Sequence, residues 1–475
     1  MINFELLNKQ RKSIKERNNK HAHERSKWVK KHPYFYKQLV HYLNTIIDEN
    51  SKVLHVRCGT GFILSKLRTK KGVGVDDSEK FIEHAADEYK DLKFVCNDVE
   101  DVKVDDKFDY VLITSTEDIV DLKAVLDSVK KNCLPHTRVI VVYYNYLWQP
   151  TVRFAEKMGW RYRMEKHNWF AFNDIKNLLT LADYDFVANK RVILSPYNRW
   201  FVSYFMNVFL ARLPFFRLFT LMNITVARAN FAPEKEASVS IVIPCRNEAG
   251  NVEDAVNRIP KLGSHTEIIF CDDKSTDGTA NVVREMIAKH PDKDIKLYEG
   301  PAISKSENVW VGFDKAQCDI LMILDADLTV IPEELPYFYE AIVKRKGEFI
   351  NGSRLVYPMH KNAMRFFNVV GNKFFSVLFS YILDTQVKDT LCGTKVVWRK
   401  DYARIKKLRG SWGMRDRWGD YELLFSASKL NLKIIDLPVH YNERVYGDTK
   451  MTGRFKNGVI MLKICIGALR KLKFN

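Results

Sequence analysis

Three features are missing from this sequence, and each absence argues against a class of protein. The eight cysteines are scattered without a Cys-x-x-Cys pair, which argues against zinc modules and a disulfide framework and for a reducing compartment. The amino terminus is polar and lysine-rich, unlike a secretory signal peptide. No charge-free apolar run reaches the roughly 18 residues that a spanning helix requires. We therefore expect a cytoplasmic protein, peripheral at the cytoplasmic face of a membrane.

Acidic residues are fewer than basic ones. The chain has 76 Lys and Arg against 58 Asp and Glu, a formal net charge of +18. Such an excess favours anionic partners, namely nucleotides, lipid phosphates, an anionic membrane surface or nucleic acid. The hydrophobic share of 46% over 475 residues is ordinary for a globular protein and sufficient for two or three domains.

The first part of the chain alternates strand and helix patterns. A short apolar strand runs into a turn with Gly59 and Gly61, and a helix pattern follows. A turn of this kind lets the backbone approach a nucleotide closely. Later apolar strands end at Asp76 and near Asp98. The alternation predicts a doubly wound α/β sheet.

This order of strand ends resembles that of class I S-adenosylmethionine-dependent methyltransferases, over roughly residues 45–190. The resemblance implies a bound S-adenosylmethionine, with its methionine part at Gly59 and Gly61, its ribose at Asp76 and its adenine near Asp98. The sequence departs from the family at His55, where an acid is usual, and at Arg57, where glycine is usual. These departures predict weak cofactor binding, or a scaffold without methyl transfer.

The segment from residue 195 to 231 is aromatic and apolar, but it is too short and interrupted to span a bilayer. Two interpretations stay open for it: a helix lying in a membrane interface, or a buried helix between domains. Residues 231–236 read as a polar linker.

The second half repeats a pattern in which an apolar strand ends in polar residues. The central example is the run 319–328, in which Asp325 and Asp327 flank Ala326. Alternate residues of an extended segment share a face, so both carboxylates can bind one hard cation such as Mg²⁺ or Mn²⁺. Ligands of open α/β sheets bind at the carboxyl ends of strands, where this pair is expected.

The order Ile-Pro-x-x-Asn-Glu, Asp-Asp-x-Ser-Thr-Asp-Gly-Thr, Asp-Ala-Asp-Leu and Gly-Ser-Arg resembles family 2 glycosyltransferases of the GT-A fold, over residues 238–475. Residues 389–395 are similar to a segment of polyprenyl-phosphate glycosyltransferases. Residues 443–450 are similar to a segment of the enzymes that transfer mannose to dolichol phosphate. The resemblance implies a nucleoside pocket, a diphosphate and metal site, and cations for donor and acceptor phosphates. The nucleoside pocket would comprise Pro244, Arg246, Glu248 and Asp273. The diphosphate and metal site would comprise Asp325, Ala326 and Asp327, with Asp327 as the main metal ligand. The cations for the donor and acceptor phosphates would be Arg354, Arg444 and Lys450.

The acceptor decides whether a general base is required. A hydroxyl acceptor needs one, and Asp420 or Glu422 stands where related enzymes have it. A lipid phosphate is already ionised and needs positioning cations instead. Asp420 can equally be an acid favoured at a helix amino terminus. The basic segment 443–450 favours the phosphate.

We therefore predict two doubly wound α/β domains in an inverting glycosyltransferase that moves a sugar from a GDP- or UDP-linked donor to a polyprenyl phosphate or similar membrane acceptor. The alternatives are a hydroxyl acceptor, a methyltransferase acting on a glycan, lipid or nucleic acid, and a non-catalytic scaffold; nucleic acid is not the expected partner. The expected domains are a methyltransferase-like domain over 1–194, the apolar segment and linker over 195–236, and the glycosyltransferase domain over 237–475.

Overall fold

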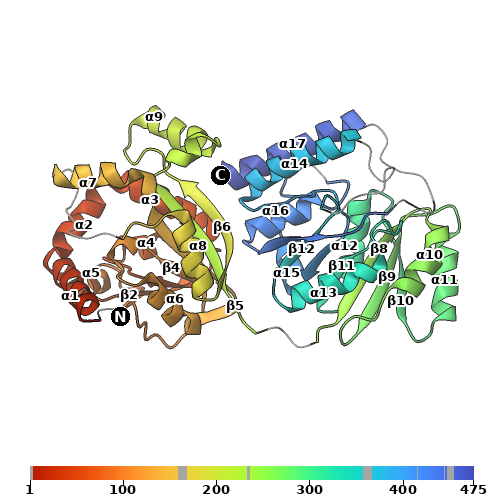
Figure 1. Cartoon of the computed structure of the whole chain (residues 1–475), viewed down its shortest axis with the longest axis horizontal. Coiled ribbons are helices and arrows are strands. Elements are labelled where there is room, and N and C mark those ends of the chain that lie inside the picture. Colours follow the sequence, from red (N-terminus) through yellow and green to blue (C-terminus); the bar gives the residue numbers. More distant parts are fainter. Residues whose placement is uncertain are drawn as a thin grey trace. The chain divides into compact units, whose positions relative to one another are not determined.

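The computed structural model describes residues 4–158, 168–232, 236–356, 366–413, 416–442, 444, 446 and 454–474. The chain divides into two compact units, one up to Phe231 and one from Ala232 to Lys473, which are described separately below (Figure 1). Each unit contains a seven-stranded sheet in which most neighbouring strands are parallel. This arrangement confirms the predicted pair of doubly wound α/β folds.

The sheet of the first unit has the strand order β3-β2-β1-β4-β5-β7-β6, with β7 antiparallel to both of its neighbours. Residues 222–229, which the sequence analysis placed in the segment between the domains, form β7 within this sheet. All of β7 is buried, because its side chains enter the hydrophobic clusters on the two faces of the sheet. The strands are β1 (Ser51–Val56), β2 (Thr69–Asp76), β3 (Lys93–Cys96), β4 (Phe108–Ile113), β5 (Cys133–Tyr144), β6 (Tyr184–Val192) and β7 (Met222–Ala229).

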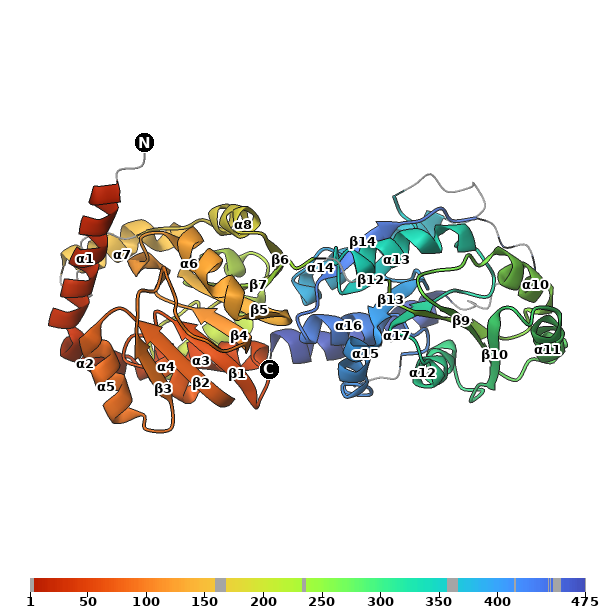
Figure 2. The same ribbon diagram turned by 90° about the horizontal axis from the view of Figure 1, so that it is seen from below.

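Helices cover both faces of this sheet, as Figure 2 shows. Apolar residues of α6 and α8 share one hydrophobic cluster with the sheet, and those of α3 and α4 share the other. The helices of the unit are α1 (Phe4–Lys20), α2 (Ala22–Lys31), α3 (Pro33–Ile46), α4 (Phe62–Lys66), α5 (Glu79–Glu88), α6 (Leu122–Val129), α7 (Gln149–Lys157), α8 (Phe172–Leu181) and α9 (Trp200–Tyr204), with short turns η1 (Thr116–Asp118), η2 (Lys130–Asn132), η3 (Tyr146–Trp148), η4 (Phe205–Phe209), η5 (Leu210–Arg212) and η6 (Phe216–Phe219).

The sheet of the second unit has the order β10-β9-β8-β11-β13-β12-β14, and β13 is antiparallel to its neighbours β11 and β12. The carboxyl ends of β8, β9, β11 and β12 therefore meet at one edge, and the beginning of β13 lies at the same edge. The strands are β8 (Val239–Cys245), β9 (Thr266–Asp272), β10 (Asp294–Glu299), β11 (Ile320–Ile323), β12 (Phe349–Ser353), β13 (Lys395–Trp398) and β14 (Ile434–Pro438).

The two faces of this second sheet carry separate hydrophobic clusters. Along β8, Ile241 and Ile243 pack into one cluster and Val242 into the other, as the alternation of side chains in a strand requires. α10, α11 and α13 cover the first face, and α12, α14, α16 and α17 the second. The helices are α10 (Ala249–Arg258), α11 (Thr279–Lys289), α12 (Lys305–Lys315), α13 (Leu335–Val343), α14 (Phe366–Leu383), α15 (Arg399–Lys406), α16 (Tyr421–Lys429) and α17 (Arg454–Lys473), with the turn η7 (Pro332–Glu334).

All eight cysteines lie in the described part of the chain and are free thiols. Seven are buried, and Cys96 at the end of β3 is exposed. Among the described residues, no helix combines the length and the apolar character that crossing a membrane demands.

Candidate active site

The loops after β8 and β9 are joined by side-chain hydrogen bonds. Asn247, which adopts a left-handed backbone (φ 54°), accepts the Thr276 N–H at 2.8 Å and donates its own N–H to Ser275 Oγ at 2.8 Å. Asp277 accepts the Ala249 N–H at 3.1 Å, at the first turn of α10. Short polar side chains thus join the two loops at which the nucleoside is predicted to bind.

The predicted nucleoside residues lie around these loops. Pro244 is within β8, and Arg246 follows it on the surface. Asp273 is buried; its Oδ1 accepts the Ala302 N–H at 2.7 Å, and its Oδ2 lies 3.7 Å from an Arg246 nitrogen. Glu248 is also buried and accepts from the Asn251 side chain at 2.8 Å.

Asp325 lies just after β11 and is paired with a cation that the sequence analysis did not identify. Its Oδ1 is 2.5 Å from Nζ of Lys305, the first residue of α12. Burial raises the pKa of Asp325, but Lys305 outweighs it and the net shift is downward. Burial likewise opposes the charge of Lys305, and Asp325 and Asp420 raise its pKa above the ordinary value. Both groups are therefore charged at neutral pH.

Asp327 is bound by groups on both of its oxygens. Oδ1 accepts the N–H and the hydroxyl of Thr329 at 3.2 and 2.8 Å, and Oδ2 is 2.5 Å from Arg444. A second nitrogen of Arg444 is 3.6 Å from Glu248. Arg444 thus links the segment after β14 to the β8 and β11 loops. Leu328, between Asp327 and Thr329, has a left-handed backbone (φ 51°). This conformation is uncommon for residues other than glycine and occurs often at functional sites.

Asp420 lies at the amino end of α16 and is paired with Lys395, the first residue of β13, at 2.8 Å. Both side chains are buried. Burial raises the pKa of Asp420, against the lowering effect of Lys395 and Lys305. The N–H groups of Tyr421 and Glu422 are bound by Asp416 instead, at 2.8 and 3.1 Å.

Arg354 follows β12 at the same edge, but its guanidinium is held by a carboxylate. Nε and one terminal nitrogen donate to the two oxygens of Asp389 at 2.7 and 2.9 Å, and the guanidinium lies 5.0 Å from the ring centre of Tyr441. Asn372 of α14 also donates to Asp389 at 2.9 Å. This network fixes the segment before β13, and a phosphate contact of Arg354 stays a prediction. Lys450 lies outside the described residues.

Asp325 and Asp327 supply hard oxygen ligands of the type that Mg²⁺ and Mn²⁺ prefer. Among the described residues, no group of three or more His, Cys, Asp and Glu side chains is arranged to hold a metal ion by itself. Mg²⁺ commonly binds through one or two carboxylates and takes its other ligands from water and phosphate. The pair therefore fits a cation that arrives with a nucleotide diphosphate.

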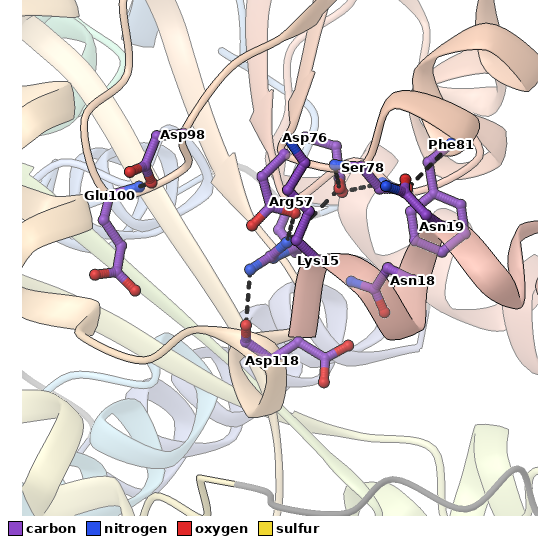
Figure 3. A network of polar contacts seen from close by, with 12 residues as sticks. Lys15, Asn18, Asn19, Arg57, Asp76, Ser78, Phe81, Asp98, Glu100 and Asp118 are labelled. Atoms are coloured by element: carbon purple, nitrogen blue, oxygen red, sulfur yellow. Dashed lines mark hydrogen bonds and ion pairs between the residues drawn. The ribbon is translucent and has the colours of Figure 1, made fainter. Parts of the chain in front are cut away.

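At the corresponding edge of the first unit, Arg57 bridges several strand ends and also has a left-handed backbone (φ 59°). Its guanidinium donates to the Asp118 carbonyl at 2.7 Å, pairs with Asp77 and lies 3.6 Å from Asp76, as Figure 3 shows in part. Asp76 is fully buried, and its oxygens accept the N–H groups of Gly59 and Ser78. Burial raises the pKa of Asp76 to about 6, although Arg57 lowers it.

Helix α1 crosses the same strand ends. Arg17 pairs with Asp118 at 2.8 Å, and Arg11 donates two hydrogen bonds to Glu100 at 2.9 and 2.7 Å. Asp98, the predicted neighbour of adenine, accepts the Glu100 N–H at 2.9 Å (Figure 3). The acid expected at the ribose is thus part of an ion-pair network with Arg57, and it also lines a pocket beside the glycine turn, so its contact with S-adenosylmethionine stays a prediction.

The glycine turn itself is present as predicted. Gly59 and Gly61 have left-handed backbones (φ 56° and 78°), and a Cβ at Gly61 would meet the Phe94 ring at 2.7 Å. An open pocket beside the turn is lined by residues from both this edge and the first helices, including Arg17, Arg25 and Arg57.

Comparison with known families agrees with the two folds. Residues 240–406 match the model of glycosyl transferase family 2, and residues 47–183 match that of a methyltransferase domain. Residues 240–406 are therefore similar to family 2 glycosyltransferases, and residues 47–183 are similar to methyltransferase domains.

The chain is also similar to individual known proteins. The chain is similar to the dolichol-phosphate mannosyltransferase of Pyrococcus furiosus, with 37% identity over 25% of this chain and 33% of that protein. It is similar to the polyprenol monophosphomannose synthase of Mycolicibacterium smegmatis, with 23% identity over 45% of this chain and 80% of that protein. A solved methyltransferase structure from Thermotoga maritima covers 45% of this chain and 99% of its own, with 15% identity and a TM-score of 0.36. The chain spans about a third of the length of the first of these relatives.

Proposed function

We propose that the second unit is an inverting glycosyltransferase that moves a sugar from a nucleotide donor to a polyprenyl phosphate at a membrane surface. One observation carries the proposal: Lys305, Lys395 and Arg444 converge on the carboxylates at a single edge of the sheet. Such an edge suits a reaction between two phosphorylated substrates. The names of the two mannosyl-transferring relatives support the same class of acceptor.

The donor nucleoside would lie against the joined loops after β8 and β9, near Asp273. Asp325 and Asp327 would hold Mg²⁺ or Mn²⁺, which supplies charge neutralisation to the diphosphate leaving group. Lys305, now paired with Asp325, would turn to the phosphate oxygens of the donor. Once it contacts the bound donor, Lys305 would stabilise the charge that builds on the departing diphosphate.

A phosphate acceptor attacks the anomeric carbon as an anion, so no proton needs to be removed. The state of Asp420 agrees with this, because its carboxylate is ion-paired with Lys395 inside the protein. In this mechanism Asp420 positions Lys395, and Arg444 and Lys450 bind the acceptor phosphate. Each charge-assisted contact contributes roughly 1.5–3 kcal/mol, about one to two decades in rate or affinity.

The test compares three variants with short-chain prenyl phosphate and with the matching prenol. We expect Arg444→Ala and Lys450→Ala to lower the initial rate of transfer to the phosphate by about one to two decades each, and Asp420→Asn to lower it less. Arg345→Ala, a cation next to the turn after α13, serves as the charge-matched control. Transfer to the alcohol but not to the phosphate, with Asp420→Asn as the most damaged variant, would contradict the proposal and identify a hydroxyl acceptor.

The metal is tested by Asp327→Asn, which keeps the size of the side chain and an oxygen for Thr329. We expect metal-dependent transfer to disappear while the thermal melting curve of the second unit stays close to that of the wild type, because the carboxylate is at the sheet edge. The measurement is the initial transfer rate of wild type and variant at increasing Mn²⁺ concentration. Full turnover by a folded Asp327→Asn protein would refute the assignment.

A further inference from the structure

The first unit has an exposed aromatic surface on the segment between β6 and β7. The side chain of Trp200 is 87% exposed, and those of Phe201 and Phe215 are each 64% exposed. In Figure 1 this yellow-green segment, with α9 at its start, stands at the margin of the unit and outside the sheet and its covering helices. We call it the aromatic patch; it comprises Trp200, Phe201, Val202, Tyr204, Phe205, Phe209, Phe215, Leu218 and Phe219.

The helical part of the segment is oriented with its polar side inward. Ser203 and Asn207, one turn apart, are fully buried. Asn207 accepts the N–H groups of Leu194 and Ser195 at 2.7 and 2.8 Å and donates to the Ser195 carbonyl at 2.8 Å. Ser203 accepts the Arg199 N–H at 2.8 Å. Hydrogen bonds therefore attach the segment to its own unit, and its apolar side faces outward.

The outward rings are ordered relative to one another. Phe201, Phe205 and Phe209 follow at successive turns, with ring centres 6.3 and 5.3 Å apart and nearly parallel planes. Phe215 and Phe219 contact each other with centres 5.3 Å apart. Side chains already held in place lose less conformational freedom when they are buried by a partner.

A second segment adjoins this surface. Trp148 donates from its indole nitrogen to the Phe219 carbonyl at 2.9 Å, and Asn145 donates to the Leu218 carbonyl at 2.9 Å. Tyr146 and Leu147, between these two donors, are themselves 50% and 53% exposed. The apolar surface is therefore continuous over two parts of the chain and is not a single protruding helix.

The charge of the region has one sign. Residues 186–232 contain no Asp or Glu, and their charged side chains are all basic. Aromatic rings prefer the boundary between lipid headgroups and acyl chains, and each Lys or Arg near an anionic leaflet is attracted to it. The basic residues are Lys190, Arg191, Arg199, Arg212, Arg217 and Arg228; of these, Arg228 is buried and paired with Asp185, so it does not contribute to the surface.

We propose that the aromatic patch docks the first unit on the surface of an anionic phospholipid bilayer, with its rings among the headgroups and its basic neighbours at lipid phosphates. The segment is short and Pro214 interrupts it, so it lies in the plane of the interface. This function requires no cofactor, and it gives the methyltransferase-type domain a role that does not depend on methyl transfer. It is independent of the transfer reaction proposed above.

The test is co-sedimentation of the full chain with vesicles of phosphatidylcholine alone or of equal parts phosphatidylcholine and phosphatidylglycerol. The wild type should bind the anionic vesicles more strongly. The variant Phe201→Glu/Phe205→Glu should bind them on the order of tenfold less, because two rings are no longer buried in lipid. Leu181→Glu is the matched control: Leu181 is 68% exposed on α8 and outside the patch, so vesicle binding should be unchanged.

Two results would overturn the proposal. One is unchanged vesicle binding by a double variant whose melting curve is that of the wild type. The other is a wild type that ignores vesicles but self-associates in sedimentation velocity, with the self-association lost in the double variant; the patch would then bind a second copy of the chain. Transfer to a water-soluble prenyl phosphate should be equal in wild type and double variant, so docking and catalysis fail or succeed separately.

Discussion

A methyl group at position 393 would collide with the carboxylate of Asp325. A Cβ built on Gly393 lies 2.1 Å from Oδ2 of Asp325, well inside van der Waals contact. The loop before β13 thus approaches the proposed diphosphate site so closely that only glycine fits there. The packing also explains how an acidic side chain after one strand is kept beside Lys305.

Gly393→Ala should therefore displace Asp325 and lower the transfer rate by about two decades or more, because a shift of about 1 Å in a catalytic group costs that much. The initial rate with saturating donor measures the effect. Gly371→Ala is the control, since a Cβ there meets nothing within 4 Å. Equal rates for wild type and Gly393→Ala would show that Asp325 takes no part in the reaction.

At the scale of elements, parallel strands made much of the site predictable. The carboxyl ends of parallel strands meet at one edge of a sheet, so the residues after β8, β9 and β11 were expected there. The structure places these residues at that edge. Lys395 was missed because β13 is antiparallel and brings its beginning, not its end, to that edge. Lys305 was missed because it opens a helix and carries no strand signal. An antiparallel strand cannot be distinguished from a parallel one by its apolar pattern alone.

In the first unit, prediction from the sequence was limited by contacts between distant parts of the chain. The departure at Arg57 was visible in the sequence, but the position of its guanidinium depends on β2, η1 and α1 together. The strand β7 was not expected, because its residues directly follow the aromatic segment and lack a distinct turn signal. Tertiary pairing with β5 and β6 determines its structure.

The bridge that Arg57 forms at the strand ends of the first unit leads to a binding prediction. Isothermal calorimetry should detect no tight binding of S-adenosylmethionine by the wild type, because Arg57 bridges the strand ends. Arg57→Gly, alone and with His55→Asp, should strengthen binding by removing the bridge. Tight binding by the unmodified chain would show that the bridge opens readily. The control for loss of charge is Arg68→Gly, because Arg68 is an exposed arginine of the same unit.

At the scale of the whole molecule, the four hydrophobic clusters each belong to one unit. We therefore expect two unfolding transitions in scanning calorimetry, with separate dependences on pH. In the first unit, burial lowers the pKa of His55 from its ordinary value of 6.5 to about 3. The unfolded chain takes up a proton below pH 6.5 and the folded unit does not, so His55 makes this unit less stable as the pH falls.

The size of that effect is about 1.4 kcal/mol per pH unit below 6.5, or roughly 2 kcal/mol at pH 5. His55→Gln should therefore reduce the acid-induced fall of the first transition by roughly 4–8 °C between pH 7 and pH 5, without moving the second. Asp76 acts in the opposite sense over the same range, since its raised pKa of about 6 makes protonation favour the folded unit, so only the difference between variant and wild type is compared.

The distribution of thiols makes the native chain suitable for labelling at one position. The eight cysteines all lie in the described residues, seven are buried, and Cys96 alone is exposed, at the end of β3. A maleimide dye should therefore attach at Cys96 much faster than elsewhere, with no cysteine replaced. Because Cys96 belongs to the first unit, the fluorophore would report on that unit in the presence of the intact second one. A protein built of two separable parts thus already contains the attachment point needed to observe one of them.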